Sequence, residues 1–118
     1  MSLKIYNLKK DGDASKEYIL LEATEDVDIG NYAIVDRTFS QEGNVSNVHK
    51  HFFRFPSKSV KKGEYVALKT GKGTSNKGTL NGTVVHIFYW GSNVAFWNDK
   101  ETERAELLKV STVSTYTA

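Results

Sequence analysis

Residues 52–68 constrain the fold of this chain more than any other stretch. They hold an aromatic run at 52–55 that stops at Pro56, a short basic linker, a Lys-Gly turn at Gly63 and a second apolar run at 65–68. Proline has no N–H to donate to a β-ladder, so Pro56 belongs at the end of a strand. Glycine tolerates the positive φ of a tight turn. The stretch therefore predicts two β-strands separated by a turn.

Eight segments show the alternation, or the enrichment in β-branched and aromatic residues, that is typical of strands. They are residues 3–8, 17–23, 32–36, 48–55, 65–69, 83–90, 94–97 and 105–110. Turn signals that contain glycine fall between many of them, as at Gly12, Gly30, Gly43 and Gly91. Short strands with regular turn signals predict an all-β sandwich or barrel.

Two segments are less regular. The glycine-rich segment 71–82 is predicted to be a long mobile loop or a hairpin tip. It contains Gly-Lys-Gly-Thr but lacks the spacing of a P-loop or of a GxGxxG motif, so we expect no nucleotide cofactor. Residues 99–109 are the best helix candidate, with Asn98 or Asp99 as N-cap. The surrounding strands favour a polar loop that enters a strand instead.

The composition fits a single domain over residues 1–118, with its core at 17–110. The 118 residues are 39% hydrophobic and 12% aromatic, whereas a disordered chain would have fewer aromatic residues. The absence of cysteine excludes disulfides and thiolate metal sites. No run approaches the roughly 20 apolar residues of a membrane span, and charged residues interrupt the start of the chain where a signal peptide has its apolar core. We expect no membrane partner; the compartment and the oligomeric state stay open.

The net charge of +2 is unevenly distributed. Residues 1–49 hold five Lys or Arg against nine Asp or Glu, residues 50–77 hold eight against one, and residues 78–118 hold three against four. A segment with a net charge of +7 could attract an anionic partner if its side chains form one patch, and is otherwise a solvated face. The candidate polyanion-binding residues are Lys50, Arg54, Lys58, Lys61, Lys62, Lys69 and Lys72.

His49 and His51 are the nearest approach to a metal-binding pair. On a strand, residues two apart share a face, so both imidazoles could reach one ion. A third ligand would have to come from His86 or from the acidic turn 25–28, and nothing in the sequence brings these segments together. A calcium site at the acidic turn would need six or more oxygen ligands. We expect no bound metal and keep His49 and His51 as candidates.

Catalytic motifs are not apparent. The chain has no cysteine nucleophile, no Gly-x-Ser-x-Gly elbow and no paired serine and histidine. No pair of carboxylates stands out for glycoside cleavage. We therefore expect a protein that is not an enzyme and has no cofactor.

Aromatic residues near the end of the chain could form a binding platform. Because successive strand residues face opposite sides, Phe88 and Trp90 share one face while Tyr89 shares the other with Ile87. Most of these rings are expected to fill the core. The rings left outside, among Tyr89, Trp90 and Trp97, could stack on a sugar or a base.

Four short motifs follow one another along the chain in the order found in one family of β-sandwiches. Residues 18–22 (Tyr-Ile-Leu-Leu-Glu) are similar to a first strand with an aromatic residue followed by Ile-Glu-Leu. Residues 27–34 (Val-Asp-Ile-Gly-Asn-Tyr-Ala-Ile) are similar to a Val-Asp-Leu-small-Gly-Trp turn and strand. Residues 55–66 run from Phe-Pro to Gly-Glu-Tyr-Val, and residues 97–107 run from Trp-Asn through an acidic loop to Ala-Glu-Leu. Together they resemble the lamin-tail domain family.

The resemblance covers much of residues 17–110 and implies an immunoglobulin-like β-sandwich of about seven to eight mainly antiparallel strands, as a bacterial-type stand-alone member. Two positions depart from the family pattern: Tyr32 stands where the family has Trp, and Thr102-Glu103-Arg104 stands where it has Gly-Asp. The resemblance implies a binding or scaffolding module, because the members of this family share no catalytic site. The resemblance therefore supplies no site residues.

Three functions follow as hypotheses. The first is a non-enzymatic interaction or scaffolding module whose partner is a protein, bound through an edge strand or a loop face. The second is binding of nucleic acid or another polyanion through the basic segment 50–77. The third is a carbohydrate- or metal-binding accessory module.

Overall fold

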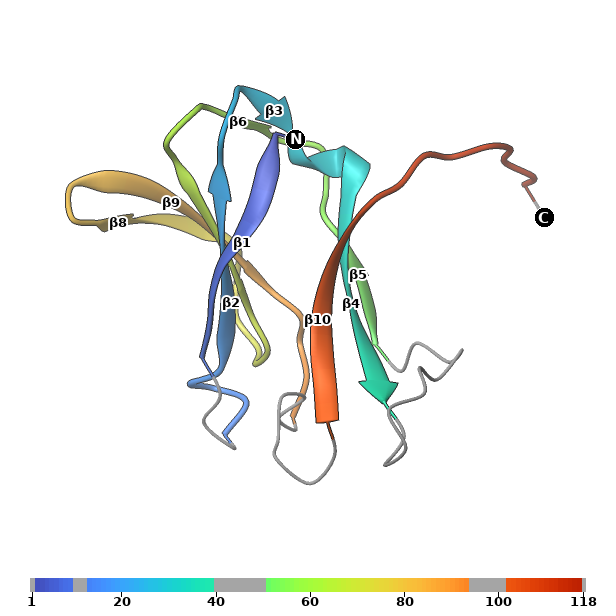
Figure 1. The fold of residues 1–118 in the computed structure, drawn as a ribbon, viewed down its shortest axis with the longest axis horizontal. Helices are drawn as coiled ribbons and strands as arrows, with labels where there is room; N and C mark the ends of the chain where they lie inside the picture. Colours follow the sequence, from blue (N-terminus) through green and yellow to red (C-terminus); the bar gives the residue numbers. More distant parts are fainter. Residues whose placement is uncertain (1, 10–12, 40–50, 94–101, 118) are drawn as a thin grey trace.

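The computed structural model describes residues 2–9, 13–39, 51–93 and 102–117, and its regular structure is almost entirely β-strand (Figure 1). The larger sheet has five strands in the spatial order β1, β2, β7, β9, β8. Their bounds are β1 (Leu3–Lys9), β2 (Tyr18–Ala23), β7 (Tyr65–Lys69), β9 (Thr83–Tyr89) and β8 (Asn76–Leu80). Among these residues, no helix is long and apolar enough to cross a membrane.

The smaller sheet has three strands in the order β10, β4, β5. Their bounds are β10 (Thr102–Lys109), β4 (Tyr32–Phe39) and β5 (Phe52–Arg54). Two short strands, β3 (Val27–Asp28) and β6 (Ser59–Val60), pair separately, and the 3₁₀ turn η1 (Ile29–Asn31) joins β3 to β4. Antiparallel pairing predominates, but β7 and β9 pair in parallel, so the larger sheet is mixed. The prediction of an all-β fold is confirmed.

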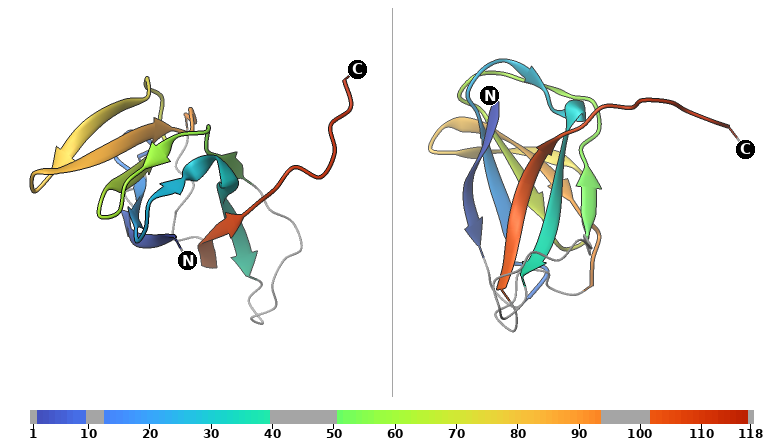
Figure 2. Two further views of the ribbon diagram at one scale, coloured as in Figure 1. Left: turned by 90° about the horizontal axis from the view of Figure 1, so that it is seen from above. Right: turned by 45° about the vertical axis from the view of Figure 1, so that its right-hand side comes forward.

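One hydrophobic core joins the two larger sheets. Ile19 and Leu21 of β2, Val66 and Leu68 of β7 and Phe88 of β9 meet Ile34 of the smaller sheet in a single buried cluster. Ala105 and Leu107 of β10 are partly buried and pack against the same cluster. Figures 1 and 2 show the sheets as two layers. Burial of these apolar side chains is the main force that holds the layers together.

Strand alternation gives the five-stranded sheet a second surface. Side chains between the core positions point away from the smaller sheet, because successive strand residues face opposite sides. Leu20, Ala67 and Val85 form a separate apolar cluster there, with Tyr18, Tyr65 and Ile87 packed against it. This surface is called the outer face below.

Most of the predicted strands match the structure. Residues 65–69 form β7 as predicted, and β1, β2, β4, β9 and β10 overlap their predicted segments. Of the strand predicted over 48–55, the described part 51–55 contains β5, and residues 48–50 and 94–97 lie outside the described residues. Residues 102–109 form β10 rather than a helix, so the predicted strand is confirmed and begins earlier than residue 105, while residues 99–101 lie outside the described residues.

The glycine-rich segment 71–82 is more ordered than a mobile loop. It contains β8, which pairs with β9 through a two-residue turn that joins Leu80 to Thr83. Asn81 and Gly82 both have positive φ, of 52° and 81°. Two such residues in a two-residue hairpin form the type I′ turn, whose twist suits the flanking strands. The segment is therefore part of a hairpin, but only Asn81 and Gly82 form its tip, and the strand β8 within it was not predicted.

Candidate functional site

The outer face is the candidate site, because it combines a shallow apolar pocket with aromatic and basic side chains. The pocket has a volume of about 190 Å³ and lies over β2, β7, β8 and β9. Its apolar lining includes Leu20, Ala67, Leu80, Val85 and Ile87. Ligand-binding pockets are typically lined by apolar and aromatic side chains with a few polar groups.

Four tyrosines surround this apolar centre. Tyr18 and Tyr65 pack against the outer cluster, and Tyr6 lies edge-on to Tyr65 with ring centroids 5.5 Å apart. Tyr6 is 56% exposed, so its ring is available to a partner. Tyr89 shares the outer side of β9 with Ile87, and any side chain added at Gly73 would come within 2.5 Å of its ring. Tyr89 is therefore held in place by the backbone that leads into β8.

Two lysines lie over tyrosine rings at the margins of the outer face. Lys69 Nζ is 5.8 Å from the centroid of the Tyr89 ring, and Lys9 Nζ is 5.9 Å from that of Tyr18. At these distances the ammonium groups are attracted by the negative faces of the rings. Each pair offers a positive charge next to an aromatic surface.

Trp90 faces the opposite side from Tyr89, as alternation predicts. It packs against the main core beside Phe53, with ring centroids 5.8 Å apart, and beside His51 at 6.2 Å. Of the three predicted platform residues, only Tyr89 lies on the outer face. Trp97 lies outside the described residues.

The structure does not gather the predicted basic residues into one patch. Lys69 lies on the outer face, whereas Arg54 follows the core residue Phe53 on β5 and so points outward from the smaller sheet. The Arg54 guanidinium donates from Nε to the carbonyl oxygen of Gly30 at 2.9 Å and from Nη1 to Thr112 Oγ1 at 3.2 Å. Lys72 is exposed in the connection from β7 to β8, and Lys50 lies outside the described residues.

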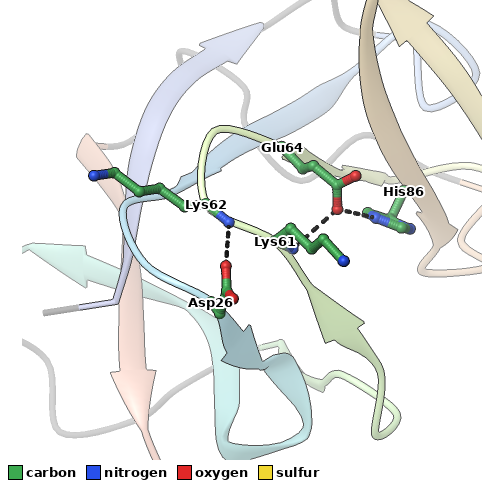
Figure 3. A network of polar contacts seen from close by, with 5 residues as sticks. All are labelled: Asp26, Lys61, Lys62, Glu64 and His86. Atoms are coloured by element: carbon green, nitrogen blue, oxygen red, sulfur yellow. Dashed lines mark hydrogen bonds and ion pairs between the residues drawn. The ribbon is translucent and has the colours of Figure 1, made fainter.

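Lys61 and Lys62 occupy the tight turn before β7. Gly63 has a φ of +89°, which confirms the predicted glycine turn. The Lys61 N–H donates to Glu64 Oε1 at 2.9 Å, and the Lys62 N–H donates to Asp26 Oδ1 at 2.9 Å. Figure 3 shows the two lysine side chains leaving the turn in different directions. Their backbones thus have structural roles, while their ammonium groups do not converge.

Glu64 also contacts His86, which is buried on β9. Glu64 Oε1 lies 3.0 Å from His86 Nε2 (Figure 3). Hydrogen bonds from the Lys61 N–H and then from His86 hold the pKa of Glu64 below its ordinary value of 4.5, despite partial burial. The arrangement stabilises the turn between β6 and β7 and the start of the parallel pair β7–β9.

The acidic turn is built around Asp28. Its Oδ1 accepts hydrogen bonds from the N–H groups of Gly30 and Lys58, at 2.8 and 3.1 Å, and its Oδ2 accepts one from Ser57 Oγ at 2.7 Å. These bonds, the one from Gly30 first, lower the pKa of Asp28. Lys58 therefore contributes its backbone N–H to this turn. The carboxylate caps η1 and ties β3 to the segment after Pro56, which is a structural role.

The candidate metal ligands are not brought together in the part of the chain that the structure describes. His49 lies outside it, His51 lies against Trp90, and His86 bonds to Glu64. Within that part, no group of three or more His, Asp or Glu residues could hold a metal ion.

Comparison with known proteins adds no family. No family model matches the chain, and no curated protein is significantly similar to it.

Three outer-face tyrosines were not among the predicted platform residues. Tyr6, Tyr18 and Tyr65 lie on strands far apart in the sequence, and they share one surface only because β1, β2 and β7 pair side by side. A β-bulge between Ile5 and Asn7 also shifts the alternation of β1. Each of these predicted strands contains a tyrosine that the sequence shows, but only the pairing of the strands shows that the three tyrosines share one surface.

Proposed function

We propose that this chain is a non-enzymatic interaction module, an immunoglobulin-like sandwich of the lamin-tail kind, which binds a protein partner on its outer face. The two sheets that share one core, the predominantly antiparallel pairing and the four ordered motifs support this proposal. The parallel pair β7–β9 lies within the larger of these two sheets.

The single observation that carries the proposal is the second apolar cluster. A sheet face turned to water normally carries polar residues, yet Leu20, Ala67 and Val85 are buried there under Tyr18 and Tyr65. Centres of protein interfaces are enriched in tyrosine and depleted of charge, with polar residues at the rim. The outer face has this arrangement, with Lys9 and Lys69 at its margins.

A pair of exposed aromatic residues offers a matched test. Tyr6 is 56% exposed on the outer face, and Phe52 is 53% exposed on the smaller sheet, beside the core residue Phe53. A photo-crosslinking amino acid is placed at either position, and the protein is irradiated in an extract of its source cells. We expect a discrete protein adduct from position 6 and none from position 52. Adducts from position 52 alone, or equal adducts from both, would contradict an outer-face partner.

A polyanion is the second candidate, favoured by the pairing of Lys9 with Tyr18 and of Lys69 with Tyr89. Single-stranded nucleic acid is bound by positive charge next to aromatic rings on which bases stack. The test is fluorescence anisotropy of labelled single- and double-stranded oligonucleotides at low and near-physiological salt. Binding that weakens steeply with salt supports this candidate, because phosphate contacts release counterions. An absence of binding at low salt contradicts it.

A further inference from the structure

One edge of the larger sheet is formed by β8 and the other by β1. Among the described strands, β8 has β9 as its one neighbour, and the pairing runs without a register shift. The strand contains no proline, and Lys77 is its one charged residue. Figure 1 shows the β8–β9 hairpin projecting from the rest of the fold. Natural proteins usually protect such edges with prolines, bulges or several charges.

The hairpin geometry fixes which backbone groups of β8 face outward. Leu80 and Thr83 close a two-residue turn, so they exchange hydrogen bonds, as does every second pair along the ladder. Gly78 belongs to this set and faces β9. The N–H and C=O groups of Lys77 and Thr79 must then point away from β9, towards a strand that could add to the edge.

The other feature is the trailing segment, residues 111–117. Its sequence is Ser-Thr-Val-Ser-Thr-Tyr-Thr, without charge, glycine or proline. Five of these seven residues are β-branched or aromatic, the types enriched in strands. The segment belongs to no strand, and its largest apolar side chains, Val113 and Tyr116, are 96% and 94% exposed. The segment therefore has the composition of a β-strand but pairs with no strand among the described residues.

The trailing segment leaves the fold far from β8 of its own chain. The Val110 N–H donates to the carbonyl oxygen of Asn31 at 2.8 Å, which fixes the start of the segment at the smaller sheet. Figures 1 and 2 show it leading away on the side opposite to the β8–β9 hairpin. Arg54 Nη1 on β5 also donates to Thr112 Oγ1 at 3.2 Å, so the segment is still held at the smaller sheet two residues beyond Val110. The β8 edge of a second copy is the accessible one.

We propose that the trailing segment of one copy adds to β8 of a second copy as an antiparallel sixth strand, with Tyr116 opposite Gly78. This register pairs Lys77 with Thr117 and Thr79 with Thr115, so the outward backbone groups of β8 all gain partners. No like charges oppose each other, and a threonine pair is favourable across strands. Gly78 has no side chain, and an aromatic ring opposite an edge glycine covers the exposed backbone.

This inference goes beyond the proposed function, because it concerns self-association through an edge rather than a partner on the outer face. The contact joins two different surfaces, so reciprocal exchange gives a closed dimer and one-way addition gives a chain of copies.

Sedimentation velocity of the full chain over a wide concentration range tests the proposal. We expect wild-type protein to associate as its concentration rises. Thr79→Pro removes an outward N–H, which an edge strand tolerates, and should weaken association by about tenfold or more. Thr74→Pro, the same exchange in the connection before β8, should associate like wild type. Thermal melts check that both variants are folded.

The donor side has its own test. Tyr116→Ala should weaken association by about tenfold, whereas Tyr116→Phe should keep it, because the ring rather than the hydroxyl covers Gly78. The chain has no cysteine, so introduced thiols report on this contact alone. A mixture of Thr79→Cys and Thr115→Cys copies should form a disulfide between copies. A mixture of Thr74→Cys and Thr115→Cys copies should form none. The proposal is overturned if the wild-type protein stays monomeric. It is also overturned if neither Thr79→Pro nor Tyr116→Ala weakens association.

Discussion

Glu64 Oε1 accepts a hydrogen bond from Nε2 of His86 at 3.0 Å, next to the only parallel strand pair among the described residues. The same oxygen accepts the N–H of Lys61 at 2.9 Å. With Nε2 as donor, the buried Nδ1 of His86 has no hydrogen-bond partner among the described residues. One carboxylate thus orients an imidazole on β9 and closes the turn that leads into β7.

Replacement of Glu64 should therefore change how stability depends on pH. The pKa of Glu64 is lowered by the fold from an ordinary value of 4.5. A group with a lowered pKa in the folded state stabilises fully above its unfolded pKa, and this stabilisation is lost as pH falls through the folded pKa. We expect Glu64→Gln to lower the melting temperature at pH 7 by roughly 3–6 °C, with a smaller difference below pH 4.5.

Thermal melts between pH 7 and pH 3 measure this effect. Glu25→Gln, in which the replaced carboxylate is exposed and accepts from Ser2 Oγ at 3.2 Å, is the control and should change the melting temperature little. A difference between wild type and Glu64→Gln that is as large at pH 3 as at pH 7 would contradict the role of the ionised carboxylate.

Gly30 is predicted to be intolerant of any side chain. A Cβ at residue 30 would lie 2.9 Å from Ser57 Cα, and backbone cannot move aside as a flexible side chain can. Gly30→Ala should cost about 1–3 kcal/mol, the usual range for overpacking. A Cβ at Gly78 would meet only the end of the Ile87 side chain, at 3.3 Å. Urea unfolding should show Gly78→Ala to be near neutral; equal losses for the two exchanges would refute this explanation.

The shared core makes a prediction that links the two sheets. Leu21 lies on the larger sheet and Ile34 on the smaller one, and both are fully buried in the same cluster. Leu21→Ala and Ile34→Ala should each cost about 2–5 kcal/mol, because each leaves a cavity in one core. Leu80→Ala, at an exposed position of the hairpin, should cost far less. Unfolding of one sheet without the other, detected by hydrogen exchange, would argue against a common core.

Much of the fold could be predicted from local patterns, and the failures have physical causes. Residues 65–69 form a strand as predicted, because an apolar run stands between the turn at Gly63 and the polar residue Thr70. β8 was not predicted, because Asn, Lys and Gly have low strand propensity. Its strand conformation depends on pairing with β9, and the signal for that hairpin was Asn81-Gly82. The two-residue strands β3 and β6 depend on the long-range hydrogen bonds of Asp28.

The candidate site was less predictable than the fold. Alternation correctly places Tyr89 and Trp90 on opposite sides of β9, but it cannot tell which side meets the smaller sheet. The basic segment is continuous in sequence, yet Arg54 and Lys69 lie on different sheets. Sequence proximity therefore exaggerated the basic patch and concealed the outer-face tyrosines, which come together only through strand pairing.

The buried contact between Thr70 and Glu17 gives the last prediction. Thr70 Oγ1 donates to Glu17 Oε1 at 2.9 Å, and the Thr70 N–H donates to the backbone carbonyl of Glu17 at 3.1 Å. Both residues are buried, so Thr70→Val keeps the shape and the backbone bond but removes the hydroxyl from a buried carboxyl. Leaving such an acceptor with one bond fewer should cost about 1–3 kcal/mol. Thr70→Ser retains the hydroxyl and should recover most of this loss in urea unfolding. If serine is as destabilising as valine, packing of the threonine methyl group, rather than the hydrogen bond, holds β2 and β7 together at this end of the sheet.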